Sequence, residues 1–167
     1  MPTVTIRPAV EADCATILRF VRELAEFERE PQAVKATEED FRREGWGETP
    51  VFEALIAELD GVPVGFALTF RNFSTWEGRS GLFVEDLYVT PDARRYGVGR
   101  KLLAAVARRA VERGCRRVDL SVLDWNPARD FYGRLGFRHM EEWMSYRLTG
   151  DAIRALAESD ADEPAAG

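Results

Sequence analysis

Cysteine and histidine are both scarce in this sequence. Its 167 residues include two cysteines, Cys14 and Cys115, and one histidine, His139. The cysteines stand far apart, with no CxxC pair and no neighbouring histidine, which excludes a disulfide framework and a metal-binding knuckle. We therefore expect reduced thiols, a structural histidine and no metal.

Long apolar runs and an excess of positive charge are missing as well. No window approaches the roughly 18 consecutive apolar residues of a membrane helix, and the stretch from Met1 to Pro8 has no apolar signal core. The formal net charge of −6 argues against a general nucleic-acid binder. We expect a cytoplasmic protein without membrane or nucleic-acid partners.

What remains is an ordinary globular composition, with 46% hydrophobic and 31% charged residues. The length suits one domain with a real core. We predict a single domain over residues 1–158, followed by a flexible acidic tail over residues 159–167.

Hydrophobic periodicity and turn residues predict a mixed α/β chain. Helices are predicted over residues 11–28 and 37–44, from the glycine loop to Gly114, over a short stretch after Pro127, and over 151–158. Strands are predicted over residues 3–7, 51–59, 62–70, 81–89, 118–122, 137–142 and 143–148, with a hairpin at Asp60-Gly61.

The order of these elements predicts the sheet. Residues 81–89 are apolar on both faces, which is typical of a central strand, and a strand–helix–strand crossover makes residues 118–122 a second inner strand parallel to it. The expected fold is α/β, with a mostly antiparallel sheet, a central parallel pair that splays apart, and helices on both faces. A ligand belongs at that splay.

A glycine loop lies between the strand ending at Val89 and the next helix. It reads Arg-x-x-Gly-x-Gly over residues 94–99, and a loop that opens a helix presents backbone N–H groups and a positive dipole end to phosphate. Leu102 replaces the third small residue of a dinucleotide fingerprint, and Gly99-Arg100-Lys101 lacks the Ser or Thr of a nucleoside-triphosphate loop. The sequence therefore predicts neither a dinucleotide-binding loop nor a nucleoside-triphosphate-binding loop.

Basic residues gather around this loop: residues 94–117 hold nine, against the single acid Glu112. Such a basic island on an acidic chain suits a small polyanion better than a long polymer. We assign Arg94, Arg95 and Arg100 to the ligand, and Arg108, Arg109 and Arg113 to a solvated helix face.

The loop resembles that of the GCN5-related N-acetyltransferases (GNAT superfamily). Asn126 followed by Phe131-Tyr132-x-x-x-Gly136-Phe137 resembles the second signature of that superfamily. The segments Ile6-Arg7-Pro8-Ala9 and Glu23-Leu24-Ala25, with Phe27-Glu28, are similar to the spermidine/spermine (diamine) and thialysine acetyltransferase branch. The resemblance implies acetyl-CoA as co-substrate, a homodimer, and acetyl transfer to a small cationic amine.

The resemblance also implies the site residues. Those implied for acetyl-CoA are Leu87, Tyr88, Val89, Arg94, Arg95, Tyr96, Gly97, Val98, Gly99, Arg100, Asn126, Phe131 and Tyr132. Those implied for the amine substrate are Phe27, Glu28, Trp76, Glu85, Asp86 and Trp143.

Two residues are implied for catalysis. Tyr132, a phenol with a pKa of roughly 10, matches the acid that protonates the CoA thiolate. Glu85 matches the acid that deprotonates or positions the amine. Strand alternation would place Glu85 and Asp86 on opposite faces, and the sequence leaves open which of them handles the amine proton.

The substrate itself also stays open. Residues 73–75 read Phe-Ser-Thr where the polyamine enzymes have an acidic residue and a proline, so a contact for a long polycation is missing. The alternatives are acetylation of protein or peptide amines and a non-catalytic acyl-CoA-binding regulatory module. Trp125 is expected to pack in the core.

Overall fold

The chain divides into two units, Met1–Phe131 and Tyr132–Gly167, and the computed structural model describes residues 1–159. The predicted acidic tail therefore lies outside the described residues, apart from Ser159. One domain over residues 1–158 stays a prediction.

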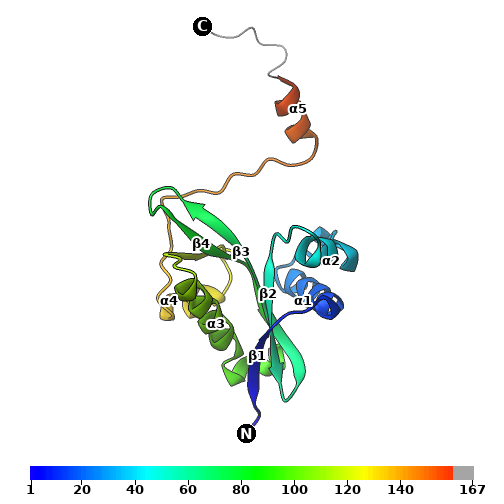
Figure 1. Ribbon diagram of the computed structural model, residues 1–167, viewed down its shortest axis with the longest axis vertical. Helices are drawn as coiled ribbons and strands as arrows, with labels where there is room; N and C mark the ends of the chain where they lie inside the picture. The colour runs from blue at the N-terminus through cyan, green and yellow to red at the C-terminus, as the bar shows by residue number, and fades with distance from the viewer. Residues whose placement is uncertain (160–167) are drawn as a thin grey trace. The chain divides into compact units, whose positions relative to one another are not determined.

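The first unit is built on a five-stranded sheet in the order β1-β2-β3-β4-β5 (Figure 1). The strands are β1 (Val4–Pro8), β2 (Glu53–Leu59), β3 (Val62–Ser74), β4 (Arg79–Val89) and β5 (Val118–Leu120). Strands β1 to β4 pair antiparallel in chain order, and β4 pairs with β5 in parallel. The predicted α/β class, the mostly antiparallel sheet and its parallel pair are confirmed.

The β2–β3 hairpin turns at the two residues that the sequence predicted, and its geometry gives the reason. Asp60 and Gly61 both have positive φ, 51° and 82°, as a two-residue turn of this hand requires, and Leu59 pairs with Val62 across it. Glycine meets this requirement without steric cost and aspartate tolerates it.

Helices connect the strands. They are α1 (Cys14–Phe27), α2 (Glu38–Trp46), α3 (Val98–Glu112) and α4 (Ala128–Arg134), with short 3₁₀ turns η1 (Glu11–Asp13), η2 (Pro31–Ala33) and η3 (Pro91–Tyr96). Thr37 begins α2 through a capping box, because its Oγ1 accepts from the Asp40 N–H at 3.2 Å while Asp40 accepts from the Thr37 N–H at 2.8 Å. The helix continues one residue past the predicted stop at Gly45.

The core lies on both faces of the sheet, with α1 and α2 on one face and α3 on the other (Figure 1). Phe20 of α1 stacks on Phe66 of β3 at 5.8 Å between ring centroids and contacts Tyr88 of β4 at the same distance. On α3, Val98, Leu102 and Val106 are fully buried. Strand β4 is thus covered on both faces, as predicted, and its ends are held firmly.

The second unit corrects the sequence-based prediction. No residue of 137–148 belongs to a strand; the Trp143 N–H donates instead to the Met140 carbonyl in a turn, and α5 (Asp151–Ser159) follows. Alternating apolar residues become a strand only when their backbone groups pair with a neighbouring strand. For the same reason β5, predicted to be an inner strand, is an edge of the sheet within residues 1–159.

Candidate active site

The phosphate-binding prediction centres on the start of α3. Gly97 has φ of 70°, a left-handed conformation that favours glycine, and turns the chain from η3 into the helix. The Lys101 N–H donates to the Gly97 carbonyl at 3.1 Å, which opens the helical ladder. The N–H groups of the first helical turn precede that ladder, so they form an anion-binding end with the helix dipole.

Two arginines flank the start of α3 in the chain. Arg95 and Arg100 are exposed and form no ion pair within residues 1–159, although the Arg95 guanidinium lies 4.9 Å from the Tyr96 ring centroid. Free guanidinium groups next to unpaired N–H groups suit a pyrophosphate. This donor set fits the phosphates of CoA.

Arg94 is engaged differently. Its Nε donates to the Val89 carbonyl at 3.0 Å, and its guanidinium lies 5.5 Å from the Phe27 ring centroid and 6.0 Å from that of Tyr88. It ties the end of β4 to the end of α1. Its predicted phosphate contact stays a prediction.

Some residues predicted to bind the cofactor could do so through backbone groups only. The side chains of Tyr88 and Val98 are buried in the core. Leu87 and Val89 pair with Ala67 and Gly65 of β3. Their side chains therefore serve the fold.

The second signature lies against the first within the first unit. A Cβ added to Gly99 would come 3.4 Å from the Phe131 ring, so that ring packs on the start of α3. Asn126 accepts from the Ala128 N–H at 2.9 Å through its side-chain oxygen, which fixes the turn into α4. Among the described residues its amide N–H groups have no hydrogen-bond acceptor, so they can donate to a ligand.

A β-bulge separates the two acids of β4. Leu68 pairs with Asp86 but Thr69 pairs with Val84, so Glu85 is the extra residue. The bulge interrupts the alternation on which the prediction of opposite faces rested. Asp86 lies on the α1 face with Tyr88 and Leu68 and is half-buried, whereas Glu85 is exposed.

Electrostatics single out Asp86. Burial raises its pKa to about 6, with further contributions from the negative charges of Glu85 and Glu28. Burial also raises the pKa of Glu28 above its ordinary value. Three carboxyl groups crowded in this way favour a cationic ligand, which would relieve their mutual repulsion.

An aromatic wall, formed by Phe27 and Trp125, begins at the residue that precedes Glu28. The ring of Phe27, at the end of α1, lies 6.0 Å from the ring of Trp125, in the loop after β5. Both are more than a third exposed, so Trp125 is not the core residue that the sequence predicted. Its position next to Asn126 was the available signal.

The other predicted substrate and catalytic residues lie elsewhere in the chain. Trp76 is 81% exposed, in the turn between β3 and β4. In the second unit, Tyr132 packs edge-on against Phe137 at 5.7 Å, and Trp143 is 67% exposed.

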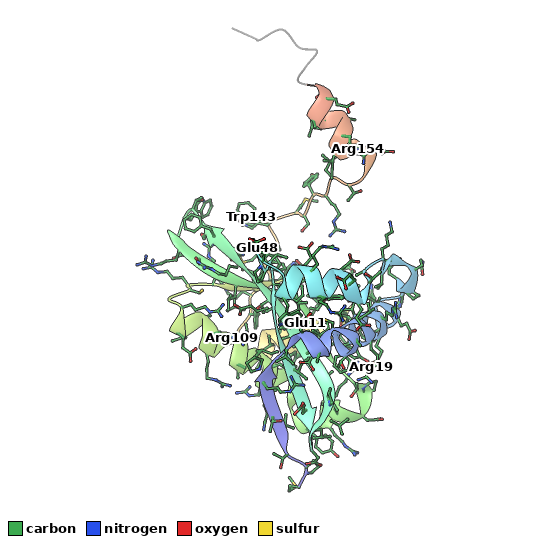
Figure 2. All side chains as sticks on the ribbon, turned by 45° about the vertical axis from the view of Figure 1, so that its right-hand side comes forward. Glu11, Arg19, Glu48, Arg109, Trp143 and Arg154 are labelled. Atoms are coloured by element: carbon green, nitrogen blue, oxygen red, sulfur yellow. The ribbon has the colours of Figure 1, made fainter. Side chains whose placement is uncertain are left out.

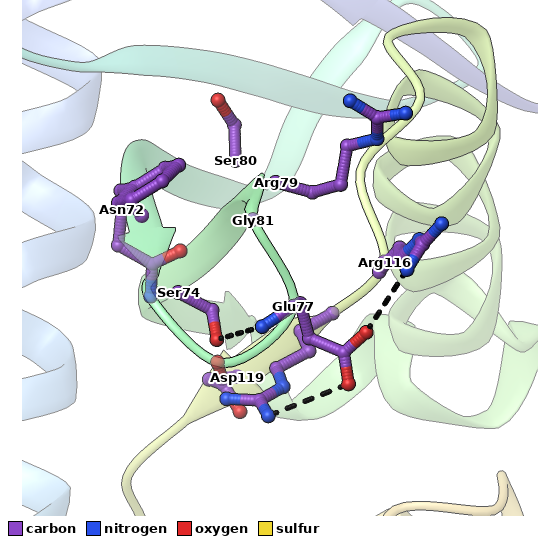
Figure 3. Close-up of a pocket in the computed structure, with 10 residues that line it drawn as sticks. Asn72, Ser74, Glu77, Arg79, Ser80, Gly81, Arg116 and Asp119 are labelled. Carbon is purple, nitrogen blue, oxygen red and sulfur yellow. Dashed lines mark hydrogen bonds and ion pairs between the residues drawn. The ribbon is translucent and has the colours of Figure 1, made fainter.

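A small cavity of about 80 Å³ lies at the far ends of β4 and α3, away from the glycine loop (Figure 3). There Glu77 pairs with Arg116 at 3.5 Å and with Arg117 at 3.6 Å, and the Glu77 N–H donates to Ser74 at 3.1 Å. The late arginines of the basic island are thus engaged with local carboxylates.

The outer part of α3 follows the same pattern. Arg109, labelled in Figure 2, pairs with Glu53 of β2 at 3.0 Å, and Arg113 pairs with the same carboxylate at 2.8 Å. These arginines hold α3 to the sheet rather than standing as a purely solvated face. This leaves the beginning of the basic island for the predicted ligand.

The described part of the chain offers neither a membrane span nor a cluster of metal ligands. None of its helices is both long and apolar enough to cross a bilayer. Nor do three or more His, Cys, Asp or Glu side chains of residues 1–159 gather closely enough to hold a metal ion.

This fold, with an anion-binding helix start after a strand of the parallel pair, is that of an acyl-CoA-dependent transferase. The Acetyltransferase (GNAT) family model matches residues 18–137, well over half of the chain, so the chain belongs to this family and is an acetyltransferase. Members of the family use acetyl-CoA.

Individual acetyltransferases and a solved structure are similar to this chain. The chain is 43% identical to the thialysine N-epsilon-acetyltransferase of Bos taurus, over 94% of this chain and 99% of that protein. It is 42% identical to an L-ornithine N5-acetyltransferase of Arabidopsis thaliana, over 58% of this chain and 43% of that protein. Among solved structures, an integron cassette protein from the mobile metagenome of V. cholerae superposes with a TM-score of 0.77 at 25% identity, covering 93% of this chain and 98% of that one.

Proposed function

We propose that this acetyltransferase transfers the acetyl group of acetyl-CoA to the terminal primary amine of a small cationic substrate, a diamine or a lysine-like amine. The observation that carries the proposal is the electrostatic interaction of Asp86, half-buried on the strand that leads to the glycine loop, with Glu85 and with Glu28 at the end of α1. Two relatives are named as acetyltransferases of thialysine and of L-ornithine, which are amines of this kind. Phe73-Ser74-Thr75 disfavours the longer polyamines.

Acetyl-CoA supplies a thioester whose carbonyl carbon accepts the amine nitrogen and whose thiolate leaves. The N–H groups at the start of α3, with Arg95 and Arg100, bind the phosphates. The backbone of Leu87 and Val89 and the amide of Asn126 orient the pantetheine arm. This arrangement uses the exposed donors described above and leaves the buried side chains to the core.

The carboxyl groups manage the charge of the amine. An alkyl ammonium has a pKa of roughly 10.4, so only about one molecule in a thousand is the free base near pH 7. Asp86 binds the ammonium, and Glu85, exposed on the bulge, receives its proton through water. This division follows from burial, since the half-buried group holds the cation and the exposed one exchanges protons with solvent.

Tyr132 returns a proton to the departing thiolate. A phenol remains protonated at neutral pH and is comparable in acidity to a thiol, so it donates only as negative charge develops on the sulfur. Trp76 and Trp143 are further side chains proposed to contact the amine.

The active species is a cytoplasmic homodimer. Supporting it, the second unit exposes large apolar side chains at Met140, Trp143, Met144, Tyr146 and Leu148. Surfaces of this kind are buried by a partner in stable assemblies.

Thiol release from acetyl-CoA in the presence of amines tests the function. A panel of putrescine, spermidine, lysine, thialysine and lysine-containing peptides should give fast release with the short free amines and slow release with spermidine and peptides. Preference for a peptide would favour a protein acetyltransferase. Tight CoA binding without release for any amine would establish a non-catalytic acyl-CoA-binding module and overturn the proposal.

A further inference from the structure

Arg29 occupies an unusual backbone position at the end of α1. The Glu30 N–H donates to the Ala25 carbonyl at 2.9 Å and the Arg29 N–H to the Glu26 carbonyl at 3.1 Å, which is the Schellman pattern of a helix end. The residue at its turning point has φ of 65° and is normally glycine. An arginine here costs stability, so its side chain requires a reason other than helix termination.

The side chain lies on the aromatic wall of the acceptor region. The Arg29 guanidinium is 4.1 Å from the Trp125 ring centroid, and the Trp125 ring contacts that of Phe27. A cation stacked on an indole at this distance is held in orientation. Trp125 thus fixes the position of the positive charge of Arg29.

The guanidinium keeps its hydrogen-bond donors for a ligand. Arg29 is exposed, and within residues 1–159 it forms no ion pair, even though Glu28 and Glu30 flank it in the chain. A stacked guanidinium with unused N–H groups can bind a carboxylate through two parallel hydrogen bonds. Its position favours recognition of a planar anion.

The acceptor region therefore has two ends of opposite charge. Asp86 interacts electrostatically with Glu28, the residue before Arg29, and Phe27, the residue before Glu28, contacts the Trp125 ring on which the Arg29 guanidinium lies. We propose that Arg29 is a specificity-determining residue that binds the α-carboxylate of the acetyl acceptor while Asp86 binds its terminal ammonium. Among the amines of the proposed function, Arg29 would then favour those that carry an α-carboxylate over the diamines that lack one.

Two physical effects would produce the selectivity for an α-carboxylate. A carboxylate gains a bidentate, charge-assisted contact, and a second ammonium at the same place is repelled by the guanidinium. The inference rests on the proposed function, because it concerns the same acceptor region.

Matched substrates test it. Lysine and cadaverine differ only by the carboxylate, as do ornithine and putrescine, so the ratio of kcat/KM within each pair isolates the contact with Arg29. We expect the wild-type enzyme to prefer lysine to cadaverine. Arg29→Gln should lower kcat/KM for lysine by about 10- to 100-fold, mainly through KM, and leave cadaverine unchanged or faster.

Three further variants separate binding from folding. Arg29→Gly suits the left-handed backbone and should raise the Tm while abolishing the preference for lysine. Arg29→Lys keeps the charge without the planar fork and should retain part of the preference. Arg22→Gln removes an exposed arginine from the same helix and should change neither rate.

Each outcome decides the question. Equal losses for lysine and cadaverine in Arg29→Gln, or equal use of both by the wild-type enzyme, would overturn the role of Arg29 while leaving an amine acetyltransferase. Absence of thiol release with every amine would overturn the proposed function, and the role of Arg29 with it.

Discussion

Burial raises the pKa of Asp86 to about 6, so this side chain changes its charge within the range of an enzyme assay. Above pH 6 it is an anion that attracts the ammonium; below pH 6 it is neutral. We expect log kcat/KM to rise with pH through deprotonation of the amine, and to fall more steeply below about pH 6 as Asp86 takes up its proton. Asp86→Asn should lose this steeper limb and lower kcat/KM at pH 8 by about 10- to 100-fold.

Stability should move in the opposite direction. A carboxyl whose pKa is raised in the folded state contributes stability below its unfolded value of 3.8, and this contribution disappears as the pH rises through about 6. Asp86→Asn should therefore unfold at a higher temperature than the wild type at pH 8 while being less active. Glu48→Gln, at an exposed position labelled in Figure 2, is the control for loss of one charge. A destabilised Asp86→Asn enzyme would contradict this account.

Tyr132 gives the second residue-level prediction. If its hydroxyl protonates the departing thiolate, Tyr132→Phe should lower kcat by about 10²-fold or more, because removal of a general acid costs roughly that much. The affinity for CoA should be preserved, since the ring and its contact with Phe137 remain. Turnover and calorimetric CoA titration measure the two effects, and an undiminished kcat would remove Tyr132 from the mechanism.

At the scale of elements, β4 and α3 together form the cofactor half of the site. Hydrogen bonds pair β4 with β3 as far as Val89 and with β5 at Leu82–Val84, and ion pairs with Glu53 hold the later part of α3. The start of α3 is held by packing, because Val98 and Leu102 are fully buried. A rigid anion-binding end needs little reorganisation when the ligand binds.

The two glycines that flank α3 make a matched pair. Gly97 at its start and Gly114 after its end both have left-handed backbones, with φ of 70° and 68°. Alanine at either position should cost about 1–2 kcal/mol of unfolding free energy. Only Gly97→Ala should also raise the Kd for CoA, by about 10-fold, because it reorients the N–H groups at the helix start.

Thermal unfolding and CoA titration of both variants test this pair. A similar loss of CoA affinity in Gly114→Ala would mean that the effect arises from helix stability alone. Unchanged affinity in Gly97→Ala would place the phosphates elsewhere.

At the scale of the whole molecule, the exposed apolar residues of the second unit predict self-association. Tyr146 is 92% exposed and Met144 78% exposed, on a segment whose alternating pattern is typical of a strand. A second copy of the chain would bury these side chains. Sedimentation equilibrium should therefore give twice the chain mass of 18.9 kDa.

Charged substitutions test the surface. The double variant Met144→Lys, Tyr146→Lys should shift the protein to monomer at micromolar concentration, because like charges meet in a symmetric contact. Glu158→Lys, on α5, changes charge without touching the apolar side chains and should remain dimeric. A monomeric wild-type enzyme would contradict the homodimer.

Local features of the chain were predictable because short-range physics governs them. The Asp60-Gly61 turn, the Thr37 cap and the left-handed Gly97 each follow from the conformational limits of a few consecutive residues. The parallel β4–β5 pair also followed, since a helix that crosses over between two neighbouring strands makes them run in the same direction. The phosphate-binding half of the site belongs to this class, as it consists of one strand end, one loop and one helix start.

Only the tertiary structure decided the acceptor half. Whether Glu85 or Asp86 is buried depends on a bulge set by pairing with β3, and the raised pKa of Asp86 depends on Glu28, far away in sequence. The contacts of Trp125 with Phe27 and Arg29 likewise join α1 to the loop after β5. Residues 137–148 failed as predicted strands because a strand needs a partner, and partners are supplied by the fold. The sequence by itself determined the glycine loop, because its geometry is local, whereas the arrangement of the proposed acceptor region was decided by burial and charge brought together from residues far apart in the sequence.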